Sequence, residues 1–137
     1  MDLNLASLPS KKTEEVRKVE KVVILGAGPA GLSAALYAAR AELSPLVLIG
    51  NELGGQASLT YTIENYPGFP DGVGGADLGE LFKKQAKHFG ARLEYDLATE
   101  VDFSRRPFVI RTYSGEGSGV RSVPNSTSER TTGLNAS

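Results

Sequence analysis

Residues 22–31 have the sequence Val-Val-Ile-Leu-Gly-Ala-Gly-Pro-Ala-Gly, in which a short apolar run leads directly into a Gly-x-Gly-x-x-Gly turn. An alanine-rich run follows at residues 32–41 and predicts a helix. A buried strand, a glycine turn and a helix N-terminus together form a site for a pyrophosphate. A lone Gly-x-Gly-x-x-Gly is weak evidence, but here the flanking segments are those that the mechanism requires. The stretch therefore predicts the βα turn of a dinucleotide-binding domain.

The small residues of this turn have distinct expected roles. Gly26 allows the tight bend, and Gly28 lets the backbone approach a phosphate because it carries no Cβ. Gly31 lets the helix pack closely against the strand. Pro29 suits the first helical turn, where its missing N–H has no intrahelical partner.

The composition limits the remaining choices. The chain has 137 residues, of which 40% are hydrophobic and 23% charged, as in a soluble globular domain. A formal net charge of -1 gives no reason to expect nucleic acid or an anionic membrane as the partner. Without cysteine, the chain itself cannot form disulfides, thiolate metal sites or a reactive dithiol. No apolar run approaches the ~18 residues of a membrane span, and residues 11–20 are densely charged, so the cytoplasm is the expected compartment.

A second buried strand is predicted at residues 45–49, parallel to the first. In dinucleotide sites a carboxylate about twenty residues beyond the glycine turn often holds the ribose hydroxyls. Here Ile49 occupies the strand tip, followed by Gly50 and Asn51, and the first carboxylate is Glu52. Two interpretations stay open: Glu52 replaces the missing acid, or it is an ordinary exposed loop residue.

Paired glycines follow in the sequence Leu-Gly-Gly-Gln-Ala at residues 53–57. They suggest backbone pressed against a flat or anionic ligand, with Gln56 offering an amide for hydrogen bonding. The alternative is an ordinary flexible turn. Residues 64–70, which include two prolines and two aromatic residues, predict a loop.

The second half of the chain predicts one more helix and a small antiparallel pair of strands. Apolar residues at spacings of three and four predict a helix over 75–89, ended by Gly90. Residues 92–96 alternate as in a strand, and residues 101–112 predict a hairpin. The only histidine, His88, has no nucleophile or second histidine beside it and is not expected to be catalytic.

The two ends differ from the middle in composition. Residues 115–137 are rich in Ser, Thr, Gly, Asn and Pro, which predicts a disordered tail because little apolar surface is available to offset chain entropy. Residues 1–19 predict a disordered or loosely helical lead-in. The expected domain is therefore an α/β unit over residues 20–114, with a parallel sheet, helices and a hairpin.

Five stretches occur in a fixed order and at characteristic separations. They are Gly-Ala-Gly-Pro-Ala-Gly at 26–31, Ala-Ala-Arg-Ala at 38–41, Gly-Gly-Gln at 54–56, Glu-Asn-Tyr-Pro-Gly-Phe-Pro at 64–70 and Arg-Pro-Phe at 106–108. Over about residues 21–116 the series resembles the bacterial-type, low-molecular-weight thioredoxin reductases. Their relatives, the flavoprotein subunits of alkyl hydroperoxide reductases, are similar here.

The resemblance implies an incomplete Rossmann-like FAD-binding domain, with no catalytic residue and no metal ligand in this chain. Backbone N–H groups of the glycine turn would hold the pyrophosphate, and residues 49–56 would wrap the ribose and approach the flavin. Asn65 matches the asparagine on the flavin side, and the backbone near Ala98 would lie by the adenine. The implied cofactor-binding residues are Gly26, Ala27, Gly28, Pro29, Ala30, Gly31, Ile49, Gly50, Asn51, Glu52, Leu53, Gly54, Gly55, Gln56, Asn65 and Ala98.

The resemblance also implies a reaction and its partners. Members of the family pass a hydride from NADPH to FAD, then electrons to a Cys-x-x-Cys pair and finally to the disulfide of thioredoxin. Thioredoxin or a related disulfide protein is therefore the implied partner, and full-length members are compatible with a homodimer.

This chain departs from that pattern in two ways. It has neither a cysteine nor a second Gly-x-Gly-x-x-Gly, so it carries no dithiol and no NADPH site. After about residue 116 the sequence stops matching, as expected for a frameshifted or truncated chain. FAD binding by this chain is thus expected to be weak or absent, without turnover.

Two other interpretations stay open: a cysteine-free relative of the ferredoxin–NADP reductases, and a non-catalytic nucleotide-binding module completed by a partner chain. A truncated sheet would also keep an unpaired edge and an uncovered apolar face, so we expect marginal stability.

Overall fold

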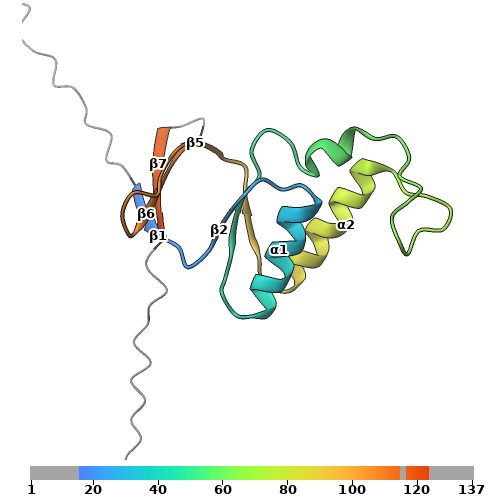
Figure 1. The fold of residues 1–137 in the computed structure, drawn as a ribbon, viewed down its shortest axis with the longest axis horizontal. Helices are drawn as coiled ribbons and strands as arrows, with labels where there is room; N and C mark the ends of the chain where they lie inside the picture. The colour runs from blue at the N-terminus through green and yellow to red at the C-terminus, as the bar shows by residue number, and fades with distance from the viewer. Residues whose placement is uncertain (1–15, 115–116, 124–137) are drawn as a thin grey trace, which may run out of the picture.

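The computed structural model describes residues 16–114 and 117–123. Their elements form two sheets with two α-helices to one side, as Figure 1 shows. In chain order the elements are β1 (Val16–Val19), β2 (Val23–Leu25), α1 (Pro29–Arg40), β3 (Leu46–Leu48), the 3-10 helix η1 (Gly55–Leu59), α2 (Gly75–His88), β4 (Arg92–Glu94), β5 (Leu97–Asp102), β6 (Phe108–Ser114) and β7 (Gly117–Val123).

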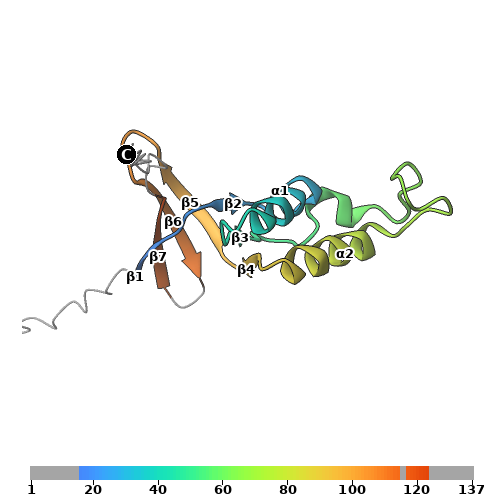
Figure 2. The same ribbon diagram turned by 90° about the horizontal axis from the view of Figure 1, so that it is seen from below.

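The first sheet is parallel and has the strand order β2-β3-β4. The helix α1 connects β2 to β3, and α2 lies between β3 and β4 in the chain, as in successive βα units. Both helices lie on the same side of this sheet, with α1 beside α2 (Figure 2). The predicted strands, helices and α/β class are thus confirmed, with element ends shifted by a few residues.

The helices begin and end at the residues that the sequence favours. Pro29 opens α1 directly after the extended N-cap Gly28. Gly90 follows α2 with a φ of 100°, and its N–H bonds to the carbonyl of Lys87 at 3.0 Å. Glycine tolerates this positive φ because it has no Cβ, so the predicted helix stop at Gly90 is confirmed.

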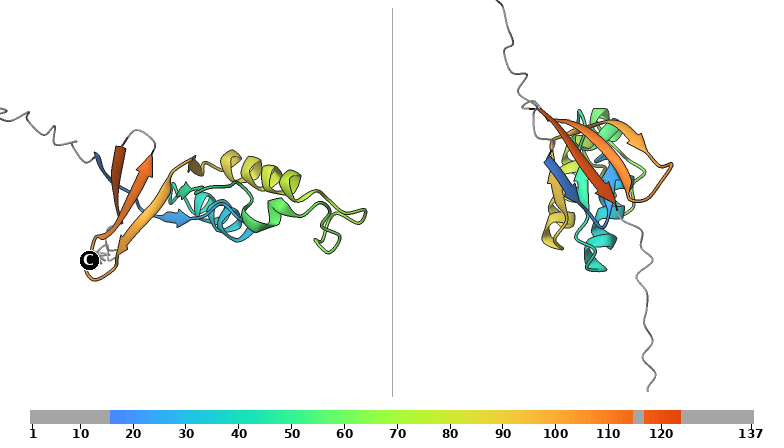
Figure 3. Two further views of the ribbon diagram at one scale, coloured as in Figure 1. Left: turned by 90° about the horizontal axis from the view of Figure 1, so that it is seen from above. Right: turned by 90° about the vertical axis from the view of Figure 1, so that its left-hand side faces the viewer.

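The second sheet has the strand order β1-β7-β6-β5. Strands β5, β6 and β7 are antiparallel neighbours, and β1 joins the outer side of β7 in parallel. This sheet lies at the end of the molecule opposite the helices (Figure 3). The predicted hairpin is therefore part of a larger sheet.

Strand β3 is the middle strand of the first sheet, and both of its faces are buried. Val47 and Ile49 pack with residues of α1 and α2, including Leu32, Ala35 and Ala86. Leu46 and Leu48 point the other way, because successive side chains alternate along a strand, and contact Ile110 of β6. Leu46 is 0% exposed and Leu48 1%.

The expectation of an uncovered apolar face was therefore wrong for β3. The second sheet supplies the cover, with Ile110, Ala98 and Val123 packed against the leucines. The expectation of an unpaired edge agrees with the structure, because β2 pairs only with β3 among the described strands.

The structure also differs from the expected chain ends. Residues 117–123 form β7, where the sequence predicted the start of a disordered tail. Backbone pairing with β6, from Phe108 opposite Val123 to Ser114 opposite Gly117, explains how a segment poor in apolar residues forms a strand. Residues 16–19 likewise form β1 inside the predicted lead-in. The remainder of the predicted tail, 124–137, and of the lead-in, 1–15, lies outside the described residues.

Candidate dinucleotide site

The carboxyl ends of the three parallel strands meet at one edge of the first sheet. Gly26, after β2, donates its N–H to the carbonyl of Leu48 at 2.8 Å. The N–H of Ile49, after β3, donates to the backbone carbonyl of Glu94 at 2.9 Å, and the N–H of Gly50 donates to the backbone carbonyl of Asp96 at 3.0 Å. In open α/β sheets ligands bind outside this edge, so the three loops that leave it define the candidate site.

The glycine turn has the backbone that its sequence predicts. Gly26 has a φ of 99°, which a residue with a side chain adopts only with strain. A Cβ added to Gly31 would lie 2.1 Å from the carbonyl oxygen of Gly26 and 3.4 Å from Cγ2 of Ile24. The third glycine of the motif is thus required by the contact between helix and strand, as expected.

The N-terminus of α1 presents backbone donors at this edge. The helical hydrogen bonds start with Leu32, whose N–H bonds to the carbonyl of Gly28 at 2.9 Å. The N–H groups of Ala30 and Gly31 precede that bond, and N–H groups in the first turn of a helix have no intrahelical partner. The first turn contains no acidic residue, so the helix dipole leaves a positive end that favours an anion.

The segment after β3 packs directly against this turn. Gly54 donates its N–H to the carbonyl of Ala27 at 2.9 Å. A Cβ added to Gly55 would lie 3.2 Å from Cα of Gly28. Both glycines have a positive φ, 86° and 57°, and Ser58 Oγ donates to the carbonyl of Gly55 at 2.7 Å. The paired glycines therefore pack against protein backbone at the glycine turn, and whether they also contact a ligand stays a prediction.

The residues around the tip of β3 differ in exposure. Ile49 is 3% exposed and faces the core, so its side chain cannot replace a ribose-binding acid. Asn51, Glu52 and Gln56 are exposed, and Leu53 packs against the helix-side core. Whether Glu52 contacts a ribose stays a prediction.

Two predicted residues lie away from the glycine turn. Asn65 is exposed in the loop between η1 and α2, which is closed by the bridge between Ile63 and Val73 and projects from the body (Figure 1). Ala98 is half-buried in β5, among the residues packed around Leu46 and Leu48. Their roles toward a flavin or adenine stay predictions.

Two glycines of α2 that contact the candidate site had no role predicted from the sequence. A Cβ added to Gly75 would lie 1.9 Å from the carbonyl oxygen of Ala57, and one added to Gly79 would lie 3.0 Å from Cα of Gly54. The available signal was their spacing, since residues at i and i+4 share one face of a helix. Helix α2 thus contacts the candidate site through backbone.

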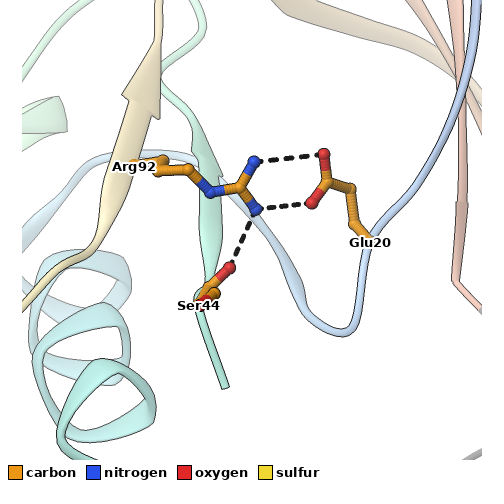
Figure 4. Close-up of polar contacts among 3 residues, drawn as sticks. All are labelled: Glu20, Ser44 and Arg92. Atoms are coloured by element: carbon orange, nitrogen blue, oxygen red, sulfur yellow. Dashed lines mark hydrogen bonds and ion pairs between the residues drawn. The ribbon is translucent and has the colours of Figure 1, made fainter. Parts of the chain in front are cut away.

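An ion pair connects the three parallel strands at their amino ends, opposite the candidate site. Arg92, at the start of β4, donates to both carboxylate oxygens of Glu20, with Nη1 to Oε1 at 3.3 Å, and its Nη2 also bonds to the carbonyl of Ser44 at 2.8 Å (Figure 4). Glu20 is 6% exposed. The hydrogen bond to Glu20 raises the pKa of Arg92. This cluster lies at the amino ends and takes no part in the candidate site.

The residues at the carboxyl edge fit the pyrophosphate of a dinucleotide. A Cβ added to Gly28 would meet nothing closer than the carbonyl oxygen of Gly54 at 3.9 Å. A Cβ added to Gly26 or to Gly50 would meet no atom within 4 Å. Open backbone next to a helix N-terminus is the arrangement that phosphate groups bind. Within the described residues there is no cluster of His, Cys, Asp or Glu suited to a metal ion, and no helix long and apolar enough to cross a membrane.

Comparison with known proteins agrees with this class of site. The sequence profile of a family described as pyridine nucleotide-disulphide oxidoreductase matches residues 20–122. The chain therefore belongs to the pyridine nucleotide-disulphide oxidoreductase family.

Within that family the chain is similar to thioredoxin reductases, as the sequence motifs indicated. The thioredoxin reductase of Rickettsia bellii is 49% identical over 94 residues, which are 69% of this chain and 30% of that protein. The NADPH-dependent thioredoxin reductase 3 of Arabidopsis thaliana is 43% identical over 111 residues, 78% of this chain and 21% of that protein. The solved thioredoxin reductase from Giardia duodenalis superposes with a TM-score of 0.68 at 36% identity, over 76% of this chain and 33% of that one.

The predicted resemblance is confirmed by these matches, but the expectation that the match ends at about residue 116 was wrong, because the family match extends to residue 122. The chain spans about a third or less of the length of the proteins that it matches. The matched part corresponds to the FAD-domain portion of a Rossmann-like protein, as predicted.

Proposed function

We propose that the chain provides the pyrophosphate-binding part of the FAD site in a thioredoxin-reductase-type oxidoreductase. The observation that carries the proposal is the junction of Gly26–Gly31 with Gly54–Gly55. There the N-terminus of α1 and an ordered glycine pair meet at the carboxyl edge of a parallel sheet.

In this proposal the backbone does most of the binding. The N–H groups of Ala30 and Gly31 donate to the pyrophosphate, and the absent Cβ of Gly28 lets it approach. Residues Gly50–Gln56 follow the ribose toward the flavin, with the exposed Gln56 amide as a further donor. Bound FAD would supply the hydride-accepting and electron-relaying chemistry.

The partners follow from the relatives. By similarity, NADPH is the proposed reductant of the complete system and thioredoxin, or a related disulfide protein, the proposed acceptor. The 137 residues contain no cysteine, so disulfide exchange needs a dithiol from another segment or chain. We therefore expect no turnover from this chain alone. The cytoplasm is the proposed compartment, and a homodimer is proposed only for the full-length form.

The open edge of β2 favours one alternative, a module completed by a partner chain. Strand β2 pairs with β3 alone among the described strands, and Leu25 at its end is 48% exposed. An exposed, apolar strand edge accepts another strand. Copurification of a stoichiometric second polypeptide, lost on replacing Val23 by Pro, would support this alternative; a monomer from the native host would contradict it.

The main proposal is tested by substitutions at Gly28. Its φ of -74° and ψ of 177° suit any residue, and an aspartate at an N-cap position stabilises a helix. Gly28→Asp should therefore keep the fold while its carboxylate repels the pyrophosphate. We expect wild-type protein to bind FAD and ADP weakly and riboflavin not at all, and Gly28→Asp to bind none of them.

Two controls make this result specific. Gly28→Asn has a similar size and capping ability without the charge, so it should lose less FAD affinity than Gly28→Asp. Equal FAD binding by Gly28→Asp and wild type, both folded by circular dichroism, would contradict the site. Near-stoichiometric flavin in the purified wild-type protein would contradict the expectation of weak binding.

A further inference from the structure

Helix α2 contacts the candidate site through two glycines. A Cβ added to Gly75 would lie 1.9 Å from the carbonyl oxygen of Ala57 and 2.8 Å from that of Thr60. The N–H of Gly75 donates to the same Thr60 carbonyl at 2.9 Å. One turn later, a Cβ added to Gly79 would lie 3.0 Å from Cα of Gly54. The backbone of α2 therefore touches the segment 54–60 without an intervening layer of side chains.

The same segment touches the glycine turn on its other side. Gly54 bonds to Ala27 at 2.9 Å, and a Cβ added to Gly55 would lie 3.2 Å from Cα of Gly28. Three stretches of backbone are thus stacked in the order α2, segment 54–60 and glycine turn. Gly54, Gly75 and Gly79 are all buried. Because native packing has little free space, a displacement at one layer is passed to the next.

We propose that Gly75 and Gly79 are positioning residues for the dinucleotide. They set how closely the segment 54–56 lies against the Gly28 turn, and therefore the relative position of the two backbone segments that would border the pyrophosphate and the flavin-proximal part of FAD. The proposal rests on the function proposed above, because it assigns these roles toward FAD. Neither glycine contacts the cofactor itself; both act through the backbone of residues 54–60.

The test compares alanine substitutions along the start of α2. Gly75→Ala places Cβ against a fixed carbonyl, and Gly79→Ala makes the milder contact at 3.0 Å, so it remains informative if Gly75→Ala does not fold. Gly74→Ala is the matched control, because its Cβ would meet chiefly the movable Asp77 carboxylate, with Oδ2 at 2.9 Å. We expect FAD affinity to fall about tenfold in Gly79→Ala, and by less than about twofold in Gly74→Ala.

Two further measurements separate positioning from general destabilisation. Ala86→Gly weakens the far end of α2, where Ala86 is 0% exposed, without touching residues 54–60. It should lower stability in urea and leave FAD affinity unchanged. In amide NMR spectra recorded without FAD, Gly79→Ala should shift the resonances of Ala27 and Gly28.

Unmoved resonances of Ala27 and Gly28 in Gly79→Ala would overturn the proposal, and so would equal losses of FAD affinity in Gly79→Ala and Ala86→Gly. If these resonances move but the wild-type chain shows no FAD binding at the turn, the proposed function fails while the coupling between α2 and the turn stands.

Discussion

Gly54 donates its backbone N–H to the carbonyl oxygen of Ala27 across 2.9 Å. This bond joins the loop after β3 to the loop after β2, two segments that leave neighbouring parallel strands. Four glycines surround the junction: Gly28, Gly54, Gly55 and Gly79. The candidate site is therefore built by backbone packing, and substitutions that add a single carbon atom are the natural way to test it.

Gly55→Ala should destabilise the protein by about 1–2 kcal/mol, because its φ is 57° and its new Cβ would lie 3.2 Å from Cα of Gly28. Gly50→Ala is the control, since it has a φ of 77° but nothing within 4 Å. Urea unfolding measures both. A smaller loss for Gly55→Ala than for Gly50→Ala would show that contact with the turn contributes nothing.

Gly31→Ala should cost about 3 kcal/mol or more, because its Cβ would lie 2.1 Å from the carbonyl oxygen of Gly26. The sign is informative: in an ordinary helix interior, replacing glycine by alanine stabilises by about 1 kcal/mol. Gly26 has a φ of 99° with no atom within 4 Å of an added Cβ, so backbone strain alone should reduce the stability of Gly26→Ala by about 1–2 kcal/mol. Thermal or urea unfolding that ranks Gly26→Ala as the more damaging change would contradict the packing described for α1.

Arg92→Met should destabilise by about 1–3 kcal/mol, because it removes the guanidinium that neutralises the buried Glu20 carboxylate. The side chain of Arg92 is 46% exposed, so solvent reduces the effect below that of a fully buried pair. Lys83→Met is the comparison, since the ion pair Lys83–Glu80 lies on the surface of α2, where solvent screens the attraction, and its loss should change stability far less. Equal losses in the two variants would mean that burial of Glu20 is unimportant.

The turn between β5 and β6 should be sensitive to acid through Asp102. The Ser104 hydroxyl, at 2.6 Å, and the Ser104 N–H, at 2.9 Å, donate to Oδ1 and lower the pKa of this carboxyl. A lowered pKa in the folded state means stabilisation above the ordinary aspartate pKa, lost as the pH falls through the folded value. NMR titration should show a higher Asp102 pKa in Ser104→Ala than in the wild type. In Ser104→Thr, which keeps the hydroxyl, the Asp102 pKa should stay close to the wild-type value. An unchanged pKa in Ser104→Ala would refute the assignment.

The parallel sheet and helices could be predicted because their signals are local. The apolar runs at 22–25 and 45–49, the spacing of apolar residues in α2 and the stop at Gly90 each depend on nearby residues alone. The glycine turn was likewise predictable, since Gly26 and Gly31 serve the local bend and the contact between α1 and β2.

Other features depend on partners distant in sequence. Strand β7 has a composition typical of a loop, and it forms because β6 and β1 supply its hydrogen bonds. The cover over Leu46 and Leu48 comes from Ile110, more than sixty residues away in sequence. Gly75 and Gly79 were predicted only as helical residues, because their contacts are with the segment around the 3-10 helix η1, about twenty residues earlier in the chain.

The most direct test of the account is an amide NMR map of the full chain titrated with FAD. We predict that the resonances of Ala27–Gly31 and Gly50–Gln56 shift with increasing FAD, that ADP reproduces the shifts in the glycine turn, and that riboflavin does not. Unchanged resonances at the turn, or shifts confined to the second sheet, would contradict the assignment of this edge as the dinucleotide site.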